Sequence, residues 1–465
     1  MAMRNPMTRA RNFVTRLRVM SDGVATLQQE LNELQSSVAV LRQSTPRISS
    51  DLDRVERTIE RSRSAANLAA RRGTLNRSSL RVVFLAHNKD AWDSIGEVIQ
   101  IMRERDDFDP IVVTVPHHYG GDTPPKGEGR MHKFLMRRGV PHLRLRKEQS
   151  LWAEELLRSL DPDIVFRQSQ WDADVDPAFS AQNLGWTRLA LIPYETMNPT
   201  HNVPWDYPSV DSAVDQHLHR AAWLVFCAND SALEIARAHS LTGGRQFRAV
   251  GHPKADALRR AEPEWPSPHE SSSRRVLWSA HHSILSGWND FGTFPEVKDA
   301  MLEWARAEPS LSFVFTHHPY LRGVLKQAAS PVSREDFAAW LDEWLSLPNT
   351  GYSRGGYAPM LAAADLLITD GPSMITESQI LSTPTVFIER EHHVPFNKIG
   401  ERIVEGVHRT PDIATARKVS ERILDQGDDL SEIQRRNTAE LFGAPGAAQR
   451  IVDAIREEAR SERGC

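Results

Sequence analysis

Histidine doublets are the residues of this chain whose type and placement are most suited to chemistry. Four of them occur, at His117-His118, His281-His282, His317-His318 and His392-His393. Each lies just after a run of residues that predicts a buried strand, as do the single residues His87 and His252. In open α/β sheets the ligand crevice lies beyond the carboxyl ends of the strands, so these imidazoles are expected around one cleft. The alternative is a set of ordinary surface or core histidines.

Imidazoles at such a cleft have three possible uses. A protonated ring would neutralise a diphosphate, whereas a neutral ring would take a proton from an attacking hydroxyl. Metal binding is the third use, because imidazole is a common zinc ligand. Adjacent residues of an extended segment point to opposite sides, which makes a doublet a poor chelate. We therefore expect neither a metal nor any cofactor beyond a bound substrate.

The segment 365–389 predicts a strand, a turn, a helix and a second strand. The turn reads Asp370-Gly371-Pro372-Ser373, and proline suits a first helical turn because its missing N–H would be unpaired there anyway. Such a helix start is a ready anion site, to which Ser373 adds a hydroxyl. Glu377 lies one turn deeper on the same helix face, where its carboxylate could accept hydrogen bonds from ribose hydroxyls. The alternative is an ordinary βαβ crossover with a solvated turn.

A third candidate is the run Gly251-His252-Pro253-Lys254-Ala255-Asp256, which follows the last expected strand of the first domain. Glycine permits an unusual turn, proline fixes the next φ, and Lys254 supplies a mobile cation. The same residues could form a simple turn. Their position at the mouth of the expected cleft favours a role in binding.

The order of elements after residue 79 predicts two Rossmann-like domains facing each other across a cleft. Expected strands of the first domain are Arg81–Ala86, Ile111–Val115, Asp163–Arg167, Arg188–Ile192, Trp223–Phe226 and Gln246–Val250. Expected strands of the second are Arg275–Trp278, Ser312–Thr316, Leu366–Thr369 and Thr385–Ile388. Helical patterns separate most of them, and a linker rich in Pro, Ser and charge covers 262–274. We place the domains at 79–261 and 262–428, with C-terminal helices at 429–465.

The first 78 residues have a different character. Apolar residues recur in alternating steps of four and three from Phe13 to Leu41 and again from Ile48 to Ile59, which is the a/d pattern of a coiled coil. Pro46 is expected to break the helix between the two halves. A single helix cannot bury such a seam, so we expect the chain to self-associate through it.

Charge is distributed unevenly along the chain. Residues 1–80 hold fourteen Arg, no Lys and seven acidic residues, so this part carries +7 and the rest −11. A basic arm on an acidic body predicts an anionic partner, and we expect the inner face of the cell membrane rather than nucleic acid. A solvated coiled-coil face is the alternative.

Composition limits the class of protein. With 465 residues, 40% hydrophobic and 25% charged, the chain is typical of a multidomain globular protein. No apolar run approaches the roughly 18 residues that span a bilayer, and the N-terminus lacks the apolar core of a signal peptide. We therefore expect a cytoplasmic protein. The two cysteines, Cys227 and Cys465, exclude a disulfide framework.

Together these motifs resemble the CDP-glycerol glycerophosphotransferase family, which builds teichoic-acid-like polymers on a two-Rossmann GT-B scaffold. The run 251–256 is similar to that family's Gly-x-Pro-x-x-Asp, His317-His318-Pro319 to its His-Pro, and Thr369–Ser373 with Glu377 to its Thr-Asp-Tyr-Ser-Ser followed by Asp. The resemblance covers about residues 160–400. It implies that His318, Ser373 and Glu377 contact the diphosphate and ribose of a donor, and that the final helices pack back towards the first domain.

The chain also departs from that family. Where the family has Trp-His-Gly, with the histidine as general base, this sequence reads Ile192-Pro193-Tyr194-Glu195-Thr196. Glu195 or His201 would have to substitute for that base. An arginine expected after Trp278 is replaced by His281-His282, and these departures leave both the donor and the acceptor open to differ from glycerol phosphate chemistry.

The sequence thus predicts a transferase that moves a glycerophosphoryl or glycosyl group from a nucleotide-activated donor to a polymer or lipid-linked acceptor. Expected catalytic residues are Glu195, His201 and His318. Expected donor-binding residues are His252, Lys254, Asp256, His281, His282, His317, Asp370, Gly371, Ser373 and Glu377. Two alternatives remain: a coiled-coil scaffold carrying an inactive nucleotide-binding module, and a nucleotide-sugar epimerase of similar fold.

Overall fold

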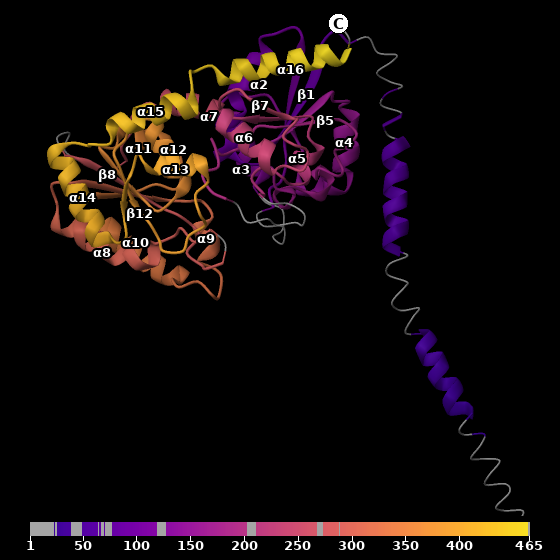
Figure 1. Ribbon diagram of the computed structural model, residues 1–465, viewed down its shortest axis with the longest axis horizontal. Coiled ribbons are helices and arrows are strands. Elements are labelled where there is room, and N and C mark those ends of the chain that lie inside the picture. The colour runs from indigo at the N-terminus through magenta and orange to yellow at the C-terminus, as the bar shows by residue number, and fades with distance from the viewer. Residues whose placement is uncertain are drawn as a thin grey trace, which may run out of the picture. The chain divides into compact units, whose positions relative to one another are not determined.

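The computed structural model describes residues 23, 26–38, 49–63, 65–66, 69, 77–118, 127–201, 211–266, 273–287 and 289–463 (Figure 1). The chain divides into two compact units, 1–76 and 77–465. The larger unit contains two lobes, each built on its own sheet.

The first lobe is formed around a seven-stranded parallel sheet in the order β3-β2-β1-β4-β5-β6-β7. Its strands are β1 Leu80–Ala86, β2 Phe108–Thr114, β3 Leu143–Arg144, β4 Ile164–Arg167, β5 Arg188–Leu191, β6 Leu224–Cys227 and β7 Phe247–Ala249. Its α-helices are α2 Gly96–Arg103, α3 Glu128–Arg137, α4 Ala153–Ser159, α5 His217–Ala221, α6 Asp230–His239 and α7 Pro253–Arg259. The 3₁₀ turns are η1 Lys89–Ser94, η2 Lys147–Trp152, η3 Asp172–Asp174 and η4 Pro177–Phe179. The central strands are buried on both faces, which explains their continuous apolar sequences.

The second lobe is formed around a six-stranded parallel sheet in the order β10-β9-β8-β11-β12-β13. Its strands are β8 Arg275–Ala280, β9 Ser312–His317, β10 Thr350–Tyr352, β11 Leu366–Thr369, β12 Thr385–Ile388 and β13 His408–Thr410. Its helices are α8 Phe294–Ala307, α9 Leu321–Val324, α10 Arg334–Ser346, α11 Tyr357–Ala363, α12 Pro372–Ile380, α13 Lys398–Val404, α14 Ile413–Gln426 and α15 Ser431–Phe442.

An aromatic cluster fixes one face of the second sheet. The ring of Trp278 lies 4.5 Å from that of Phe315 and 5.6 Å from that of Trp340, measured between centroids, and Phe294 stacks at 5.8 Å. All four side chains are buried. Since each aromatic side chain buries about 150–250 Å², this packing holds the ends of β8 and β9 in a fixed position for the loops that follow them.

The last helix, α16 Ala447–Arg463, returns to the first lobe and packs beside α2 (Figure 1). The Asp256 carboxylate accepts hydrogen bonds from the backbone N–H groups of Gly446 and Ala447, at 2.9 and 2.8 Å, and so caps the start of α16. Ile451 and Ile455 join the core of the first lobe. The preceding helix, α15, packs instead against α12 and α13.

A polar seam joins the two lobes next to residue 200. Asn397, at the start of α13, donates from its side chain to the carbonyls of Asn198 and Thr200, at 2.9 and 3.1 Å. Gly400 lies so close to this segment that a Cβ atom there would be 2.0 Å from the Pro199 oxygen. Only glycine fits, which makes this seam a built contact between the lobes.

The N-terminal unit is helical over 26–38 and 49–63. The predicted seam residues within these ranges expose between 40% and 66% of their surface: Leu27, Leu31, Leu34, Val38, Leu52, Val55 and Ile59. The seam residues before residue 23 lie outside the described residues, and so do the seam residues Leu41 and Ile48 and the expected break at Pro46. Pairing through this seam stays a prediction. Among the described residues, no helix has the length and apolarity needed to cross a membrane.

The sequence missed three strands, β3, β10 and β13. Each is an edge strand of two or three residues. Edge strands are covered on fewer sides, so they lack the long apolar run by which the inner strands were recognised.

Candidate functional site

The amino end of α12 is the centre of the candidate site. β11 ends at Thr369, Gly371 occupies the N-cap position without a side-chain cap, and Pro372 begins the helix. Every residue of α12 is buried except Ser373, which is exposed at its tip. The helix therefore presents its uncapped first turn to a ligand while the rest of it is fixed inside the protein.

Asp370 fastens the loops around this tip. Its carboxylate accepts hydrogen bonds from the backbone N–H of His281 and of Thr293, both at 2.6 Å, and from the Thr293 hydroxyl at 3.1 Å. Burial raises the pKa of Asp370 to about 6, although these hydrogen bonds act in the opposite direction. Asp370 thus positions the start of α8 and the loop after β8, and this loop carries the ring of His281 beside the helix.

Three imidazoles gather beside the tip. The rings of His282 and His318 stack with centroids 4.1 Å apart, and His281 lies 4.3 Å from His282 and 5.6 Å from His318. A Cβ atom at Gly371 would lie 3.6 Å from the ring of His281, which places this cluster directly against the turn into α12. The loops after β8 and β9 therefore converge on the start of the helix that follows β11, as the sequence predicts.

Hydrogen bonds define which ring nitrogens carry protons. Nδ1 of His281 accepts from the backbone N–H of Ser283 at 3.3 Å, so the Ser283 hydroxyl, 2.8 Å from the same nitrogen, also donates to it. Nδ1 of His318 accepts from the backbone N–H of Tyr320 at 3.2 Å. Both neutral rings therefore carry their proton on Nε2.

Burial keeps the cluster neutral. It lowers the pKa of His318 to about 4, with the charges of His317 and Lys254 adding to the effect. It also lowers the pKa of His281 and His282 well below the usual value, and their mutual repulsion with His318 acts in the same direction. Without a ligand the site offers N–H donors rather than positive charges, and an anion placed here would favour protonation.

The second residue of the His317-His318 doublet reaches the cluster, whereas the first faces elsewhere. His317 donates from Nδ1 to the backbone carbonyl of His318 at 2.8 Å and accepts at Nε2 from the Tyr352 hydroxyl at 2.9 Å. Its ring is thus engaged in holding β9 to β10.

A buried ion pair crosses between the lobes one turn below the tip. Lys254 of α7 lies 2.8 Å from Glu377 of α12, and the Tyr357 hydroxyl donates to the other oxygen of the same carboxylate. Burial alone would lower the pKa of Lys254, but Glu377 and Tyr357 outweigh it and the net shift is upward. The sequence did not single out Tyr357, because a tyrosine after two glycines carries no signal of a partner distant in the chain.

His252 holds α7 in place. Its Nε2 donates to the Pro193 carbonyl at 2.8 Å, and its Nδ1 accepts from the backbone N–H of Lys254 at 3.2 Å, which caps the helix. Burial lowers the pKa of His252 to about 4. The ring therefore orients Lys254 by connecting the end of β5 to the start of α7.

The two expected acid–base residues of the first lobe lie in different surroundings. Glu195, half-buried after β5, accepts a hydrogen bond from the Gln170 amide at 3.0 Å. Burial raises its pKa, while this bond and the charge of Lys254 oppose the shift. His201 is exposed in the seam between the lobes, with its ring 6.4 Å from that of His239. Glu195 is the residue that is electrostatically coupled to the candidate site.

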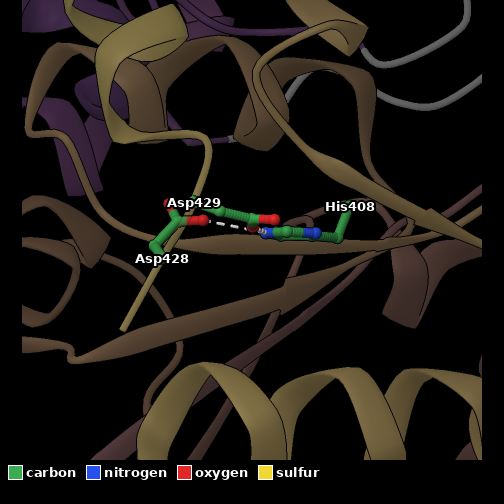
Figure 2. Close-up of side chains that lie close together, drawn as sticks. All are labelled: His408, Asp428 and Asp429. Carbon is green, nitrogen blue, oxygen red and sulfur yellow. Dashed lines mark hydrogen bonds and ion pairs between the residues drawn. The ribbon is translucent and has the colours of Figure 1, made fainter. Parts of the chain in front are cut away.

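Two further histidine groups have structural surroundings. Nε2 of His393 lies 2.9 Å from the Glu389 carboxylate, which accepts its hydrogen bond, and the ring stacks on Phe291 at 4.4 Å, whereas His392 is exposed. His408, on β13, lies 2.8 Å from Asp428 and 3.5 Å from Asp429 (Figure 2).

Metal binding is not favoured at His408, although its ring and the two carboxylates lie close enough to share an ion. The Arg422 guanidinium donates to Nδ1 of His408 at 3.4 Å. Nε2 then carries the proton and donates to Asp428. The group is a hydrogen-bonded clasp between β13 and the loop after α14.

No family model and no curated protein matches the sequence. Among solved structures, S. aureus MnaA in complex with UDP matches with a TM-score of 0.56 and 11% identity, covering 82% of this chain and 97% of that one. UDP-GlcNAc 2-epimerase from Neisseria meningitidis, bound to UDP-GlcNAc, matches with a TM-score of 0.55 and 12% identity, covering 81% and 100%. The epimerase from Methanocaldococcus jannaschii, with UDP-GlcNAc and UDP, gives 0.52 and 14%, covering 82% and 99%. These likenesses confirm the predicted fold: two parallel-sheet α/β lobes in the GT-B arrangement.

Proposed function

We propose that this protein is a nucleotide-sugar enzyme that binds a nucleoside diphosphate-linked sugar between its lobes. The observation that carries the proposal is the exposed, uncapped tip of α12 at Ser373, with His281 and His318 beside it. Backbone N–H groups and a helix dipole lie at this tip, and two Nε2–H donors belong to the cluster beside it, a combination that suits a diphosphate. Ser373 and the imidazoles would bind the phosphates without a metal.

Glu377 is suited to the ribose. Each of its carboxylate oxygens already has one partner, Lys254 or Tyr357, and each retains a further lone pair for a hydroxyl. The ion pair also fixes the carboxylate in one orientation and keeps its charge compensated. A ribose would therefore meet a preorganised acceptor rather than a mobile side chain.

Epimerisation of the sugar is the reaction we favour. Inverting a C–H centre requires a group that removes a proton on one face and another that returns it on the opposite face. Glu195, whose pKa is raised by burial, is the candidate for one of these two groups. The solved structures with the same fold include proteins described as UDP-GlcNAc 2-epimerases.

Transfer to an acceptor is the second candidate. It is favoured by the placement of the residues that resemble CDP-glycerol glycerophosphotransferases, since His318 and the turn 370–373 lie together at the site. In this case Glu195 would take the proton of the acceptor hydroxyl, and the imidazoles would stabilise the departing nucleotide. The acceptor would be a polymer or lipid-linked hydroxyl at the membrane.

One incubation separates these reactions. The protein is mixed with UDP-GlcNAc in D₂O without acceptor, and in parallel with UDP- and CDP-linked donors plus polyol acceptors. Epimerisation gives a deuterated sugar of changed configuration, whereas transfer gives product and free nucleotide only with an acceptor. The Glu195→Gln variant should lose about 10²-fold or more in turnover while binding UDP normally. Nucleotide binding without any turnover would support an inactive scaffold and refute the enzyme proposal.

A further inference from the structure

His87 lies just past the carboxyl end of β1 and is buried in an unusual way. Its side chain is only 5% exposed, and among the residues that the structure describes neither Nδ1 nor Nε2 has a hydrogen-bond partner. Leaving a buried polar group unpaired costs free energy, since its hydrogen bonds to water are lost without replacement. Such a group in a native fold calls for an explanation, and an absent ligand is one.

The backbone at His87 is held firmly. The Gln168 side-chain oxygen accepts from the backbone N–H groups of His87 and Asn88 at 2.8 and 2.9 Å, and its amide donates to the Asn88 carbonyl at 3.1 Å. These three hydrogen bonds of Gln168 fix the course of the loop. The position of the imidazole is therefore built into the fold.

The surroundings keep the imidazole of His87 uncharged. Burial, the ring of His117 at 4.6 Å and the buried guanidinium of Arg167 together lower its pKa well below the usual value. Arg167 is itself paired with Asp172 and with the Trp171 carbonyl. The ring of His87 is consequently neutral, with one N–H donor and one bare nitrogen acceptor.

A second buried polar atom lacks a partner at the same edge of the sheet. The side-chain oxygen of Gln170, a residue only 2% exposed, has no hydrogen-bond partner within the described ranges. β1 pairs with β4, with Leu85 opposite Arg167, so His87 and Gln170 follow the ends of neighbouring strands. The Gln170 amide also contacts Glu195, which connects this edge to the proposed acid–base residue.

We propose that His87, supported by Gln170, forms a binding subsite in the first lobe for a neutral, hydroxyl-bearing group, either the sugar or the polyol part of the substrate. The two nitrogens of a neutral ring, one a donor and one an acceptor, point in different directions, so they match two hydroxyls of a sugar or polyol. An anion would need two donors, and a cation would be repelled by Arg167. The inference rests on the proposed function and names the part of the substrate that the first lobe recognises.

The affinities of UDP and UDP-GlcNAc for wild type and for His87→Leu, measured by titration calorimetry, test this assignment. We expect the wild type to bind UDP-GlcNAc more tightly than UDP. The His87→Leu protein should bind UDP within twofold of wild type but UDP-GlcNAc about tenfold more weakly, as loss of a buried hydrogen bond implies. His87→Gln should recover part of the loss. The control is His132→Leu, since that ring contacts His142 on the far side of β2 and should affect neither ligand.

Equal affinity of wild type and His87→Leu for UDP-GlcNAc would overturn the subsite while leaving the proposed function intact. A second measurement applies if the variant folds poorly or the wild type binds no nucleotide. In ¹⁵N imidazole spectra of the wild type, N-acetylglucosamine or glycerol should shift the His87 resonances. Spectra that both compounds leave unchanged would refute the inference even if the nucleotide binds.

Discussion

Burial determines the protonation state of single residues at this site. His318 shows the effect most clearly. Its burial and its neighbours keep it neutral at a pH near the ordinary pKa of about 6.5, at which an exposed histidine would be half protonated. Asp370 shows the opposite case of an acidic group. Its carboxylate is buried in a turn and accepts hydrogen bonds from three donors. Both are properties of the surroundings, and the sequence shows only the residue type.

The depressed pKa of His318 makes stability depend on pH. Its folded value of about 4 lies below the unfolded value of about 6.5, so the unfolded state binds more protons between them. The contribution is fully present above pH 6.5 and falls as pH drops towards 4. At pH 5 the loss from this one group is roughly 1–2 kcal/mol.

Urea denaturation at pH 7.5 and pH 5 measures this dependence. Because other buried histidines act in the same direction, the comparison is between wild type and His318→Gln. The variant should lose less stability on acidification, by roughly 1–2 kcal/mol. Identical pH dependence in the two proteins would show that His318 is protonated as readily in the folded state as in the unfolded one.

At the scale of elements, the tip of α12 brings together the helix dipole and the histidine loops. We expect Ser373→Asp to have opposite effects on stability and on binding. A carboxylate at a helix start favours folding by about 0.3–1 kcal/mol, whereas it repels a diphosphate and should weaken UDP binding about tenfold or more. Ser373→Asn serves as the matched neutral control. Thermal unfolding and calorimetry check the two effects, and UDP affinity equal in both variants would place the diphosphate elsewhere.

The elements that could be predicted are those whose own residues form a clear local pattern. Inner strands such as Leu366–Thr369 are covered on both faces and read as apolar runs, and the turn into α12 follows from Gly371 and Pro372. The edge strands β3, β10 and β13 escaped because they lack a long apolar run, and Tyr357 because its partners are distant in the chain. The gathering of His281, His282 and His318 was predictable from strand-end placement, but that His318 rather than His317 joins the group depends on loop geometry.

At the scale of the whole molecule, the lobes are joined by buried polar contacts, and Lys254–Glu377 is the one at the site. Removing one partner leaves a buried charge unpaired, so Lys254→Met or Glu377→Gln alone should each destabilise by about 3–5 kcal/mol. The double variant should cost clearly less than the sum of the two. A double-mutant cycle by denaturation measures this, and additive losses would show that the two charges do not interact.

The N-terminal unit gives a further prediction at this scale. Its exposed a/d residues, such as Leu31 and Ile59, are expected to pair with those of a second copy. Sedimentation of the full chain should show an oligomer, whereas residues 77–465 alone should sediment as a monomer. Leu31→Asp with Ile59→Asp should dissociate the full-length oligomer, and an oligomer that survives these changes would exclude the seam as its interface.

The basic arm gives a separate prediction. Deletion of residues 1–78 should abolish binding to anionic vesicles, and unchanged binding would exclude the arm as the membrane contact.

The most direct measurement of the central claim is a crystal structure of the protein with a nucleoside diphosphate, chosen from UDP, CDP and GDP by affinity. We expect phosphate oxygens within hydrogen-bond distance of the Ser373 backbone N–H and of Nε2 of His281 or His318, with the ribose hydroxyls on Glu377. A nucleotide bound away from the start of α12, or no binding of any of the three, would contradict it.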